Sequence, residues 1–239
     1  MIETRRLYPY LISIGVFLVI FLLTAAYDKT EGQFNLGKFL EILSVLNVEK
    51  TMAEIGRSLA LSAIVLICIV FLLGPLSKFF PKRFAKWIYL RREMGLLGFA
   101  MAAVHAIYSL SAFYDFRIDG LTARQLAGVF AGSCALIIFF LLSITSNKTS
   151  MIVLGPRWKI LQRFGYVGLF IATIHFYLLE TTPEFSFEFT PLSAVLFGIP
   201  ILTIFVKLWS MYIERKEIEK AKNTRENKPP IKKENEDLV

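Results

Sequence analysis

Long apolar runs alternate with short basic loops along this 239-residue chain. Six of these runs lie at about residues 8–27, 59–76, 94–114, 125–145, 162–180 and 191–213. A run of about 20 apolar residues is long enough to cross the hydrocarbon core of a bilayer as an α-helix. The pattern therefore predicts an all-α integral membrane protein, built as a bundle of six transmembrane helices.

The distribution of Lys and Arg predicts which side of the membrane each loop faces. If both termini are cytoplasmic, the segments on that side hold 21 of the 27 basic residues. The segment 180–193 on the other side has three acidic residues and no basic one. Because cytoplasmic loops are enriched in Lys and Arg, we predict cytoplasmic termini and a multi-pass protein of the cell inner (plasma) membrane. Three tryptophans fall near the inner boundary, as interfacial tryptophans do: Trp87, Trp158 and Trp209.

The first span has two interpretations. Arg5 and Arg6 precede an apolar stretch that ends in Thr24-Ala25-Ala26, a pattern also found in signal peptides. The stretch is close to full spanning length, whereas the apolar region of a signal peptide is shorter, so we predict an uncleaved helix. Residues 34–48 then place apolar side chains at helical spacing. They predict an amphipathic helix that either lies on the outer membrane face or packs on the bundle.

Composition narrows the possible partners. Apolar residues make up 55% of the chain, and the net charge of +8 comes from basic residues in loops between apolar runs. That distribution indicates contact with membrane lipid and argues against nucleic acid as a partner. Cys68 and Cys134 lie inside apolar runs, where thiols behave as small hydrophobic groups, and we expect no disulfide.

The only two histidines, His105 and His175, lie in the middle of apolar spans. An ionisable side chain within a membrane is costly and marks a candidate functional site. The two spans run in the same direction, with His105 13 residues beyond Arg92 and His175 12 residues beyond Arg163. Both therefore lie roughly 18–20 Å from the cytoplasmic edges of their helices. Two imidazoles at one depth can bind opposite faces of a haem, whose iron accepts histidine as an axial ligand.

Each histidine also lies in a stripe of small residues at spacings of three and four, which share one helix face. The stripes comprise Gly95, Gly98, Ala102, Ser109 and Ala112 around His105, and Gly165, Gly168 and Ala172 before His175. A porphyrin lying along a helix needs such clearance, but small residues also let membrane helices pack closely without a cofactor. Three interpretations stay open on the residues alone: a bis-histidine haem, a structural pair of histidines, and a proton-relay or metal-ion site.

Three segments carry a resemblance to a known family: GRSLALSAIVLICIVFLLGPLSKFFPKRF, RREMGLLGFAMAAVH and GPRWKILQRFGYVGLFIATIHF. Together, residues 55–180 resemble the ferric-reductase-like transmembrane domain. Within that family they look most like the haem-binding membrane subunits of bacterial periplasmic methionine sulfoxide reductases. The resemblance implies a haem-binding membrane domain at 55–213. A first transmembrane helix and outer segment at 1–54 would precede it, and a charged cytoplasmic tail at 214–239 would follow.

The resemblance also implies roles for individual residues. His105 and His175 match the histidine pair that holds the haem nearer the outer face, where they would be the metal ligands. Two-haem relatives such as NADPH oxidases have a second histidine 13 or 14 residues earlier on each helix, where this chain has Arg91 and Gln162. Neither side chain ordinarily ligates haem iron, so we predict a single haem b.

The source of electrons is expected to be a separate molecule. The sequence has no Gly-rich nucleotide-binding fingerprint, so electrons would arrive from a flavin reductase, a bound flavin or a quinol. The resemblance suggests FMN or a quinone on the inner side. Four basic residues there have the chemistry to hold a phosphate or a haem propionate: Arg91, Arg92, Arg157 and Lys159. Ordinary positive-inside residues that contact lipid headgroups would give the same pattern.

We therefore predict an electron carrier that passes electrons from the cytoplasmic side or the quinone pool to an acceptor at the outer face. By resemblance, that acceptor is the catalytic subunit of a periplasmic methionine sulfoxide reductase. Two histidine ligands leave the iron no open position for oxygen, which favours electron transfer over oxygen binding. Direct reduction of ferric chelates is one alternative. A haem-free transporter or membrane scaffold is another, and the absence of haem would exclude both redox functions.

Overall fold

The structure of the chain is a computed structural model, and it describes residues 2–28, 33–35, 37, 40, 48–112, 120–180 and 191–226. Within these residues, six long helices account for most of the chain: α1 (Ile2–Ala26), α3 (Val48–Phe79), α5 (Leu90–Ala112), α6 (Ala123–Ile144), α8 (Pro156–Glu180) and α9 (Pro191–Glu226). Each predicted span overlaps one of these six helices where it is described. Three of the helices, α3, α8 and α9, are clearly longer than the spans predicted for them. The shorter elements are α4 (Pro81–Phe84), η1 (Ala85–Trp87), α7 (Lys148–Leu154), and the paired antiparallel strands β1 (Tyr27–Asp28) and β2 (Gln33–Phe34).

Local sequence signals explain several helix ends. Thr122 caps α6, because its side-chain oxygen accepts a hydrogen bond from the Gln125 amide while the Gln125 side chain accepts one from the Thr122 amide. Asn147 caps α7 in the same way through the Ser150 amide. Gly155 separates α7 from α8 with a positive φ of 52°, a conformation that other residues rarely adopt.

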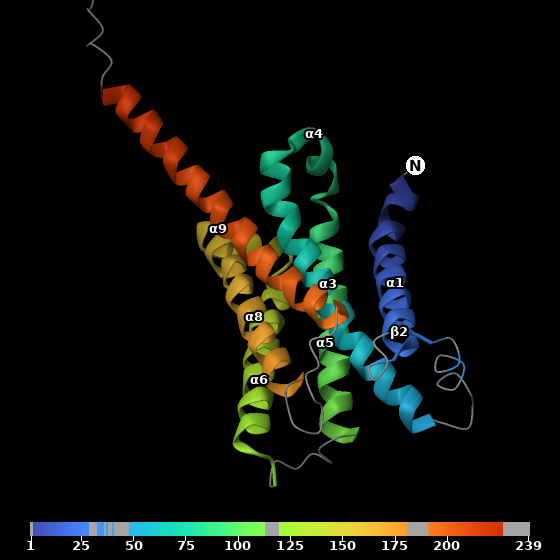
Figure 1. Cartoon of the computed structure of the whole chain (residues 1–239). Helices are drawn as coiled ribbons and strands as arrows, with labels where there is room; N and C mark the ends of the chain where they lie inside the picture. Colours follow the sequence, from blue (N-terminus) through green and yellow to red (C-terminus); the bar gives the residue numbers. More distant parts are fainter. Residues whose placement is uncertain are drawn as a thin grey trace, which may run out of the picture.

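Two helix hairpins form the body of the bundle. α3 packs along α5, and α6 packs along α8, while α1 and α9 lie against α3 (Figure 1). Buried side chains of α3, α6 and α8 join the two hairpins, among them Phe71, Phe139 and Leu169. A second buried cluster, which includes Leu66 and Met94, fills the space between α3 and α5. α3 is therefore the central helix of the bundle.

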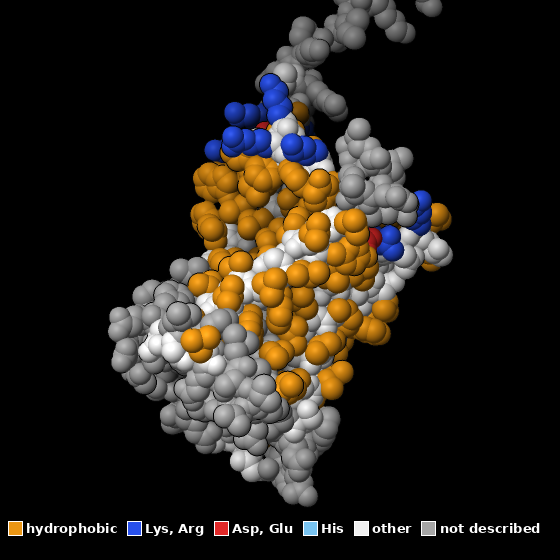
Figure 2. Space-filling view, turned by 90° about the vertical axis from the view of Figure 1, so that its right-hand side faces the viewer, with side chains coloured by type: hydrophobic (Ala, Val, Ile, Leu, Met, Phe, Trp, Pro, Cys, Tyr) orange, Lys and Arg blue, Asp and Glu red, His pale blue; other side chains and the backbone are white. Residues whose placement is uncertain are grey.

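Hydrophobic side chains cover much of the outer surface of the helices (Figure 2). Within the described residues, five helices are long and apolar enough to cross a membrane, at Leu7–Ala26, Glu54–Phe79, Leu90–Ser111, Ala123–Ile144 and Phe197–Thr224. α8 has 25 residues but is not among the five; it carries Arg157, Lys159, Arg163 and His175. The chain is thus a multi-pass membrane protein with five candidate spans, and the sixth span stays a prediction.

Lys and Arg gather at one end of the bundle, which we call the basic end. It comprises the end of α3, the connection through α4 and η1, the start of α5, α7 and the start of α8. Its basic residues are Lys78, Lys82, Arg83, Lys86, Arg91, Arg92, Lys148, Arg157 and Lys159. The N-terminal end of α1 and the C-terminal end of α9 lie toward the same end as α4 (Figure 1). Figure 2 shows Lys and Arg in the upper half of the view.

Several predictions stay untested by this architecture. The division at residues 54/55 falls inside α3, and the division at 213/214 falls inside α9, which continues to Glu226. The amphipathic helix predicted at 34–48 lies mostly outside the described residues, as do most of the acidic loop at 180–193 and the tail beyond residue 226. The side of the membrane on which the termini lie is also a prediction.

Candidate functional site

His175 projects from α8 onto the backbone of α6. Its Nδ1 atom lies 2.8 Å from the carbonyl oxygen of Gly128. A Cβ atom at Gly132, one turn further along α6, would lie 2.6 Å from the same nitrogen and 2.7 Å from Cε1 of the ring. The imidazole therefore occupies space that exists only because residue 132 is glycine.

His105 repeats this arrangement in the other hairpin. Its Nδ1 atom, on α5, lies 3.0 Å from the carbonyl oxygen of Gly56 on α3. The Ser109 hydroxyl, one turn along the same helix, lies 3.3 Å from that nitrogen. The ring of Tyr108 covers Gly56, where a Cβ atom would lie 2.6 Å from Cδ1 of the tyrosine. Glycine is thus required on α3, where the Tyr108 ring lies against Gly56, and on α6, where the His175 ring lies against Gly132.

These hydrogen bonds assign the proton on each ring. A carbonyl oxygen only accepts, so Nδ1 of each histidine carries the proton and donates it. The neutral ring then has its lone pair on Nε2, the atom that binds metals when Nδ1 is held by a carbonyl. Within the described residues, neither Nε2 atom has a hydrogen-bond partner, and both side chains are half-buried. Each ring therefore has the tautomer that an axial haem ligand requires.

The two histidines belong to helices that do not pack closely on each other. α5 packs on α3 and α8 packs on α6, while α5 and α8 make at most slight contact. No group of three or more His, Cys, Asp or Glu side chains able to hold a metal ion is present among the described residues. A pair of ligands suits a porphyrin, which supplies the remaining ligands itself, better than a bare metal ion.

The stripes of small residues serve helix packing at their glycine positions. Gly98 of α5 faces α3, where a Cβ atom would lie 3.2 Å from Ile67 and 3.4 Å from the Ala63 carbonyl oxygen. Gly168 of α8 faces α6, with Ile138 at 3.0 Å from such a Cβ atom. Close helix packing, one of the two explanations considered above, therefore accounts for these glycines.

The four basic residues predicted to hold a phosphate or propionate have separate surroundings. Arg91 is half-buried, and its Nε donates to the Val70 carbonyl oxygen at 3.1 Å. Arg92 is exposed and donates to the Ser146 carbonyl oxygen at 2.8 Å. Arg157 and Lys159 are exposed at the start of α8. A role of these four residues in holding a phosphate or a propionate stays a prediction.

Sequence reasoning missed the three glycines that hold the imidazoles: Gly56, Gly128 and Gly132. One signal was present, because Gly128 and Gly132 form a GxxxG motif, which allows close approach in membrane helices. Gly56 has no such partner and could be found only from the packing of α3 on α5. At the position of a second-haem ligand, Gln162 instead donates weakly to the Leu142 carbonyl oxygen at 3.5 Å.

The helical membrane domain and its pair of histidines agree with the ferric-reductase-like class that the sequence resemblance implied. Residues 59–173, just under half of the chain, match the ferric reductase like transmembrane component family, in agreement with the resemblance noted in the sequence. The chain is also similar to the protein-methionine-sulfoxide reductase heme-binding subunit MsrQ of Agrobacterium fabrum. The two are 30% identical over 127 residues, which cover 50% of this chain and 55% of the relative. The chain thus aligns with about half of that relative's length.

Proposed function

We propose that the chain is a haem-binding membrane subunit that carries electrons for a methionine sulfoxide reductase. The observation that carries this proposal is the matched pair of imidazoles: each donates from Nδ1 to a glycine carbonyl, and neither Nε2 has a hydrogen-bond partner in the part of the chain that the structure describes. The similarity to MsrQ, a heme-binding subunit, supports the choice of haem as the bound group. A structural pair of histidines would not need two free Nε2 atoms inside a membrane domain.

A haem b held by two histidines supplies reversible one-electron transfer. The chain's own residues supply the rest. His105 and His175 would be the axial ligands, and the Gly56 and Gly128 carbonyl oxygens fix the tautomer and tilt of each ring. The buried apolar side chains that join α3, α6 and α8 would keep water from the space between the two hairpins and lower the local dielectric. A single haem is proposed because Arg91 and Gln162 stand where a second pair of ligands would be.

We place the basic end on the cytoplasmic side of the inner (plasma) membrane, with α8 as the sixth span and both termini cytoplasmic. The excess of Lys and Arg at that end supports this orientation. Electrons would enter there from a flavin reductase, a bound FMN or a quinol, with Arg91, Arg92, Arg157 and Lys159 as residues that could hold a phosphate. They would leave at the opposite face toward the catalytic subunit of a periplasmic methionine sulfoxide reductase.

The proposal is tested with purified full-length protein and two variants, His105→Ala and His175→Ala. The native protein should bind one haem b per chain, measured by a pyridine haemochrome assay, with the sharp reduced band of a low-spin bis-histidine haem. Each variant should lose stable haem binding. A low-spin spectrum retained in either variant would remove the proposed ligand pair, and a colourless native protein would remove the redox function.

The acceptor is tested separately. The reduced protein should be reoxidised by the catalytic subunit in the presence of a methionine sulfoxide substrate, and only slowly by soluble ferric chelates. Rapid reoxidation by ferric citrate without any partner protein would instead support direct ferric-chelate reduction.

A further inference from the structure

Four basic side chains from four different helices converge at the basic end of the bundle. They are Lys78 of α3, Arg91 of α5, Arg163 of α8 and Lys207 of α9, and Lys207 interacts electrostatically with the other three. Glu214 of α9 is the one carboxylate among the described groups that act on Lys207. We call the four basic residues the cationic cluster. With Glu214 included, four positive charges face one negative charge.

Arg91 is held within the bundle by the backbone of α3. Its Nε donates to the Val70 carbonyl oxygen at 3.1 Å. Its guanidinium lies beside Gly74, where a Cβ atom would be 3.4 Å from Nη1. One edge of the guanidinium is therefore used by α3, and the remaining N–H groups stay available to another acceptor.

Lys207 is half-buried and placed by an aromatic ring. Its Nζ atom lies 5.4 Å from the centroid of the Tyr166 ring, within the range of a cation–π interaction. The Tyr166 hydroxyl in turn donates to the Phe71 carbonyl oxygen at 2.9 Å, which fixes the ring between α8 and α3. The ammonium group of Lys207 thus has a defined position but no carboxylate in hydrogen-bond contact among the described residues.

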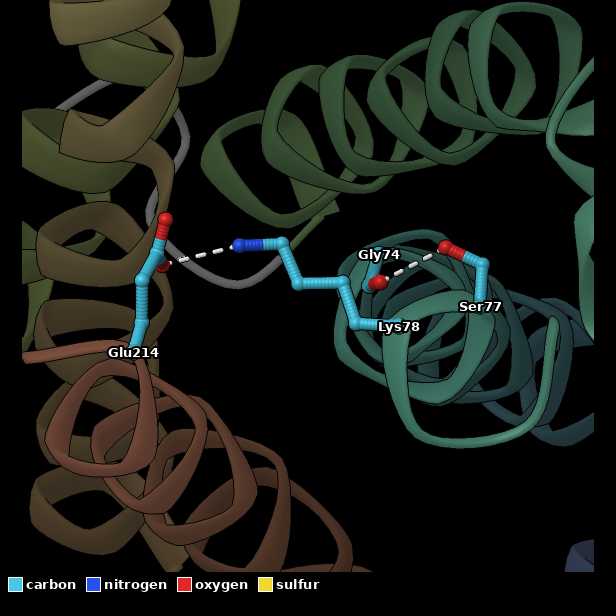
Figure 3. A network of polar contacts seen from close by, with 4 residues as sticks. All are labelled: Gly74, Ser77, Lys78 and Glu214. Carbon is cyan, nitrogen blue, oxygen red and sulfur yellow. Dashed lines mark hydrogen bonds and ion pairs between the residues drawn. The ribbon is translucent and has the colours of Figure 1, made fainter. Parts of the chain in front are cut away.

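Lys78 and Glu214 form the rim of the cluster. Lys78 reaches from α3 to Glu214 on α9, and its Nζ atom lies 2.8 Å from the carboxylate (Figure 3). Both side chains are about half exposed, at 54% and 52%. This carboxylate is therefore paired with Lys78, and no other carboxylate among the described residues forms an ion pair with Arg91, Arg163 or Lys207.

Bringing several positive charges together next to apolar side chains costs free energy unless an anion neutralises them. Arg and Lys together are the residues that recognise phosphate, Arg through paired N–H groups and Lys as a point charge. Clusters of basic residues between membrane helices at the cytoplasmic surface are suited to the phosphates of anionic phospholipids. We infer that the cationic cluster is a binding site for a phosphate-bearing anion, presented there by the headgroup of an anionic phospholipid.

This site is separate from the histidine pair. Arg91 precedes His105 by 14 residues on α5, which corresponds to about 21 Å along the helix. The inference therefore does not depend on haem binding, and its failure would leave the proposed electron-carrier function intact. It also differs from a general excess of basic residues, because Lys82 and Lys86 at the same end are exposed and lie outside the cluster.

The experiment uses the purified full-length protein in a delipidating detergent, titrated with phosphatidylglycerol or phosphatidylcholine and observed by native mass spectrometry. We expect one phosphatidylglycerol to bind well above the phosphatidylcholine background. In the double variant Arg91→Gln/Lys207→Gln, the affinity for phosphatidylglycerol should fall by at least roughly tenfold. The matched control, Lys82→Gln/Lys86→Gln, removes the same charge from the same end and should bind like the native protein.

A further variant is expected to increase the affinity for phosphatidylglycerol, a change that a folding defect would not produce. Glu214→Gln releases Lys78 and removes the competing carboxylate, and it should bind phosphatidylglycerol several-fold more tightly. Competition by millimolar inorganic phosphate or FMN would identify a soluble phosphate as the source of the anion, still at this site. Equal binding of the two lipids, equal loss in the control variant, or no gain in Glu214→Gln would overturn the inference.

Discussion

Nδ1 of His175 lies 2.8 Å from the carbonyl oxygen of Gly128, on a helix that itself contributes no candidate ligand. The same helix leaves room for the imidazole at Gly132. α6 thus sets both the tautomer and the position of a side chain that belongs to α8. The corresponding contact between His105 and Gly56 gives α3 the same role toward α5.

Gly132→Ala should disturb the haem without removing a ligand. The new Cβ atom would lie 2.6 Å from Nδ1 of His175, so the ring must move away and its hydrogen bond to Gly128 must weaken. Loss of an outer hydrogen bond to a ligating histidine typically costs about 10–100-fold in affinity. We expect weaker haem retention and a shifted midpoint potential, measured by haem titration and by spectroelectrochemistry.

The matched control for this prediction is Gly15→Ala. Gly15 lies in the middle of α1, and a Cβ atom there would meet nothing within 4 Å. The substitution should leave the haem spectrum and potential unchanged. A Gly132→Ala protein that behaved like the control would show that the ring does not depend on the glycine slot.

Gln162→His should leave the haem count at one per chain. The new imidazole would have no partner across the bundle, because Arg91 occupies the corresponding position on α5 and donates to the Val70 carbonyl oxygen. The measurement is a pyridine haemochrome assay with quantitative amino-acid analysis. Two haems per chain in this single variant would mean that the inner end already provides a ligand.

Thr24→Val should loosen the contact between α1 and α3. The Thr24 and Ser58 hydroxyl oxygens lie 2.9 Å apart, and both side chains are buried. Hydrogen bonds between membrane helices average about 0.6 kcal/mol, with a maximum of about 1.7 kcal/mol. A double-mutant cycle with Ser58→Ala, followed by unfolding in detergent, should give a coupling free energy in that range.

The control for the cycle is Ser133→Ala, since this exposed hydroxyl donates only within α6, to the Val129 carbonyl oxygen. It should change the free energy of unfolding by no more than a few tenths of a kcal/mol. Additive effects of Thr24→Val and Ser58→Ala would show that the two hydroxyls do not interact in the membrane.

The C-terminal end of α9 should face the cytoplasm. Fluorescent-protein fusions after Glu226 should therefore fluoresce, whereas alkaline phosphatase fused at the same point should be inactive. A fusion after Glu180, at the opposite end of α8, should give the reverse pattern. A fusion after Glu180 that fluoresces and lacks phosphatase activity would contradict α8 as a spanning helix.

The helices could be predicted from sequence because twenty-residue apolar runs leave few alternatives in a membrane. The candidate ligands could also be predicted, since His105 and His175 are the only histidines and share one depth. Their carbonyl partners could not, because a contact between residues 175 and 128 depends on how α8 packs on α6. The cationic cluster was hidden for the same reason: Arg91 and Lys207 lie far apart in the sequence, and only the packing of α5 and α9 on α3 brings their helices together.

Each histidine hydrogen-bonds within its own hairpin, and the two hairpins follow one another in the chain. During synthesis, the first hairpin can therefore close and set its imidazole before the second has left the ribosome. The second hairpin then completes itself as an independent unit. A flat molecule held by both imidazoles would add a second connection between hairpins that Phe71, Phe139 and Leu169 already join. Its removal should therefore leave both hairpins folded and packed together.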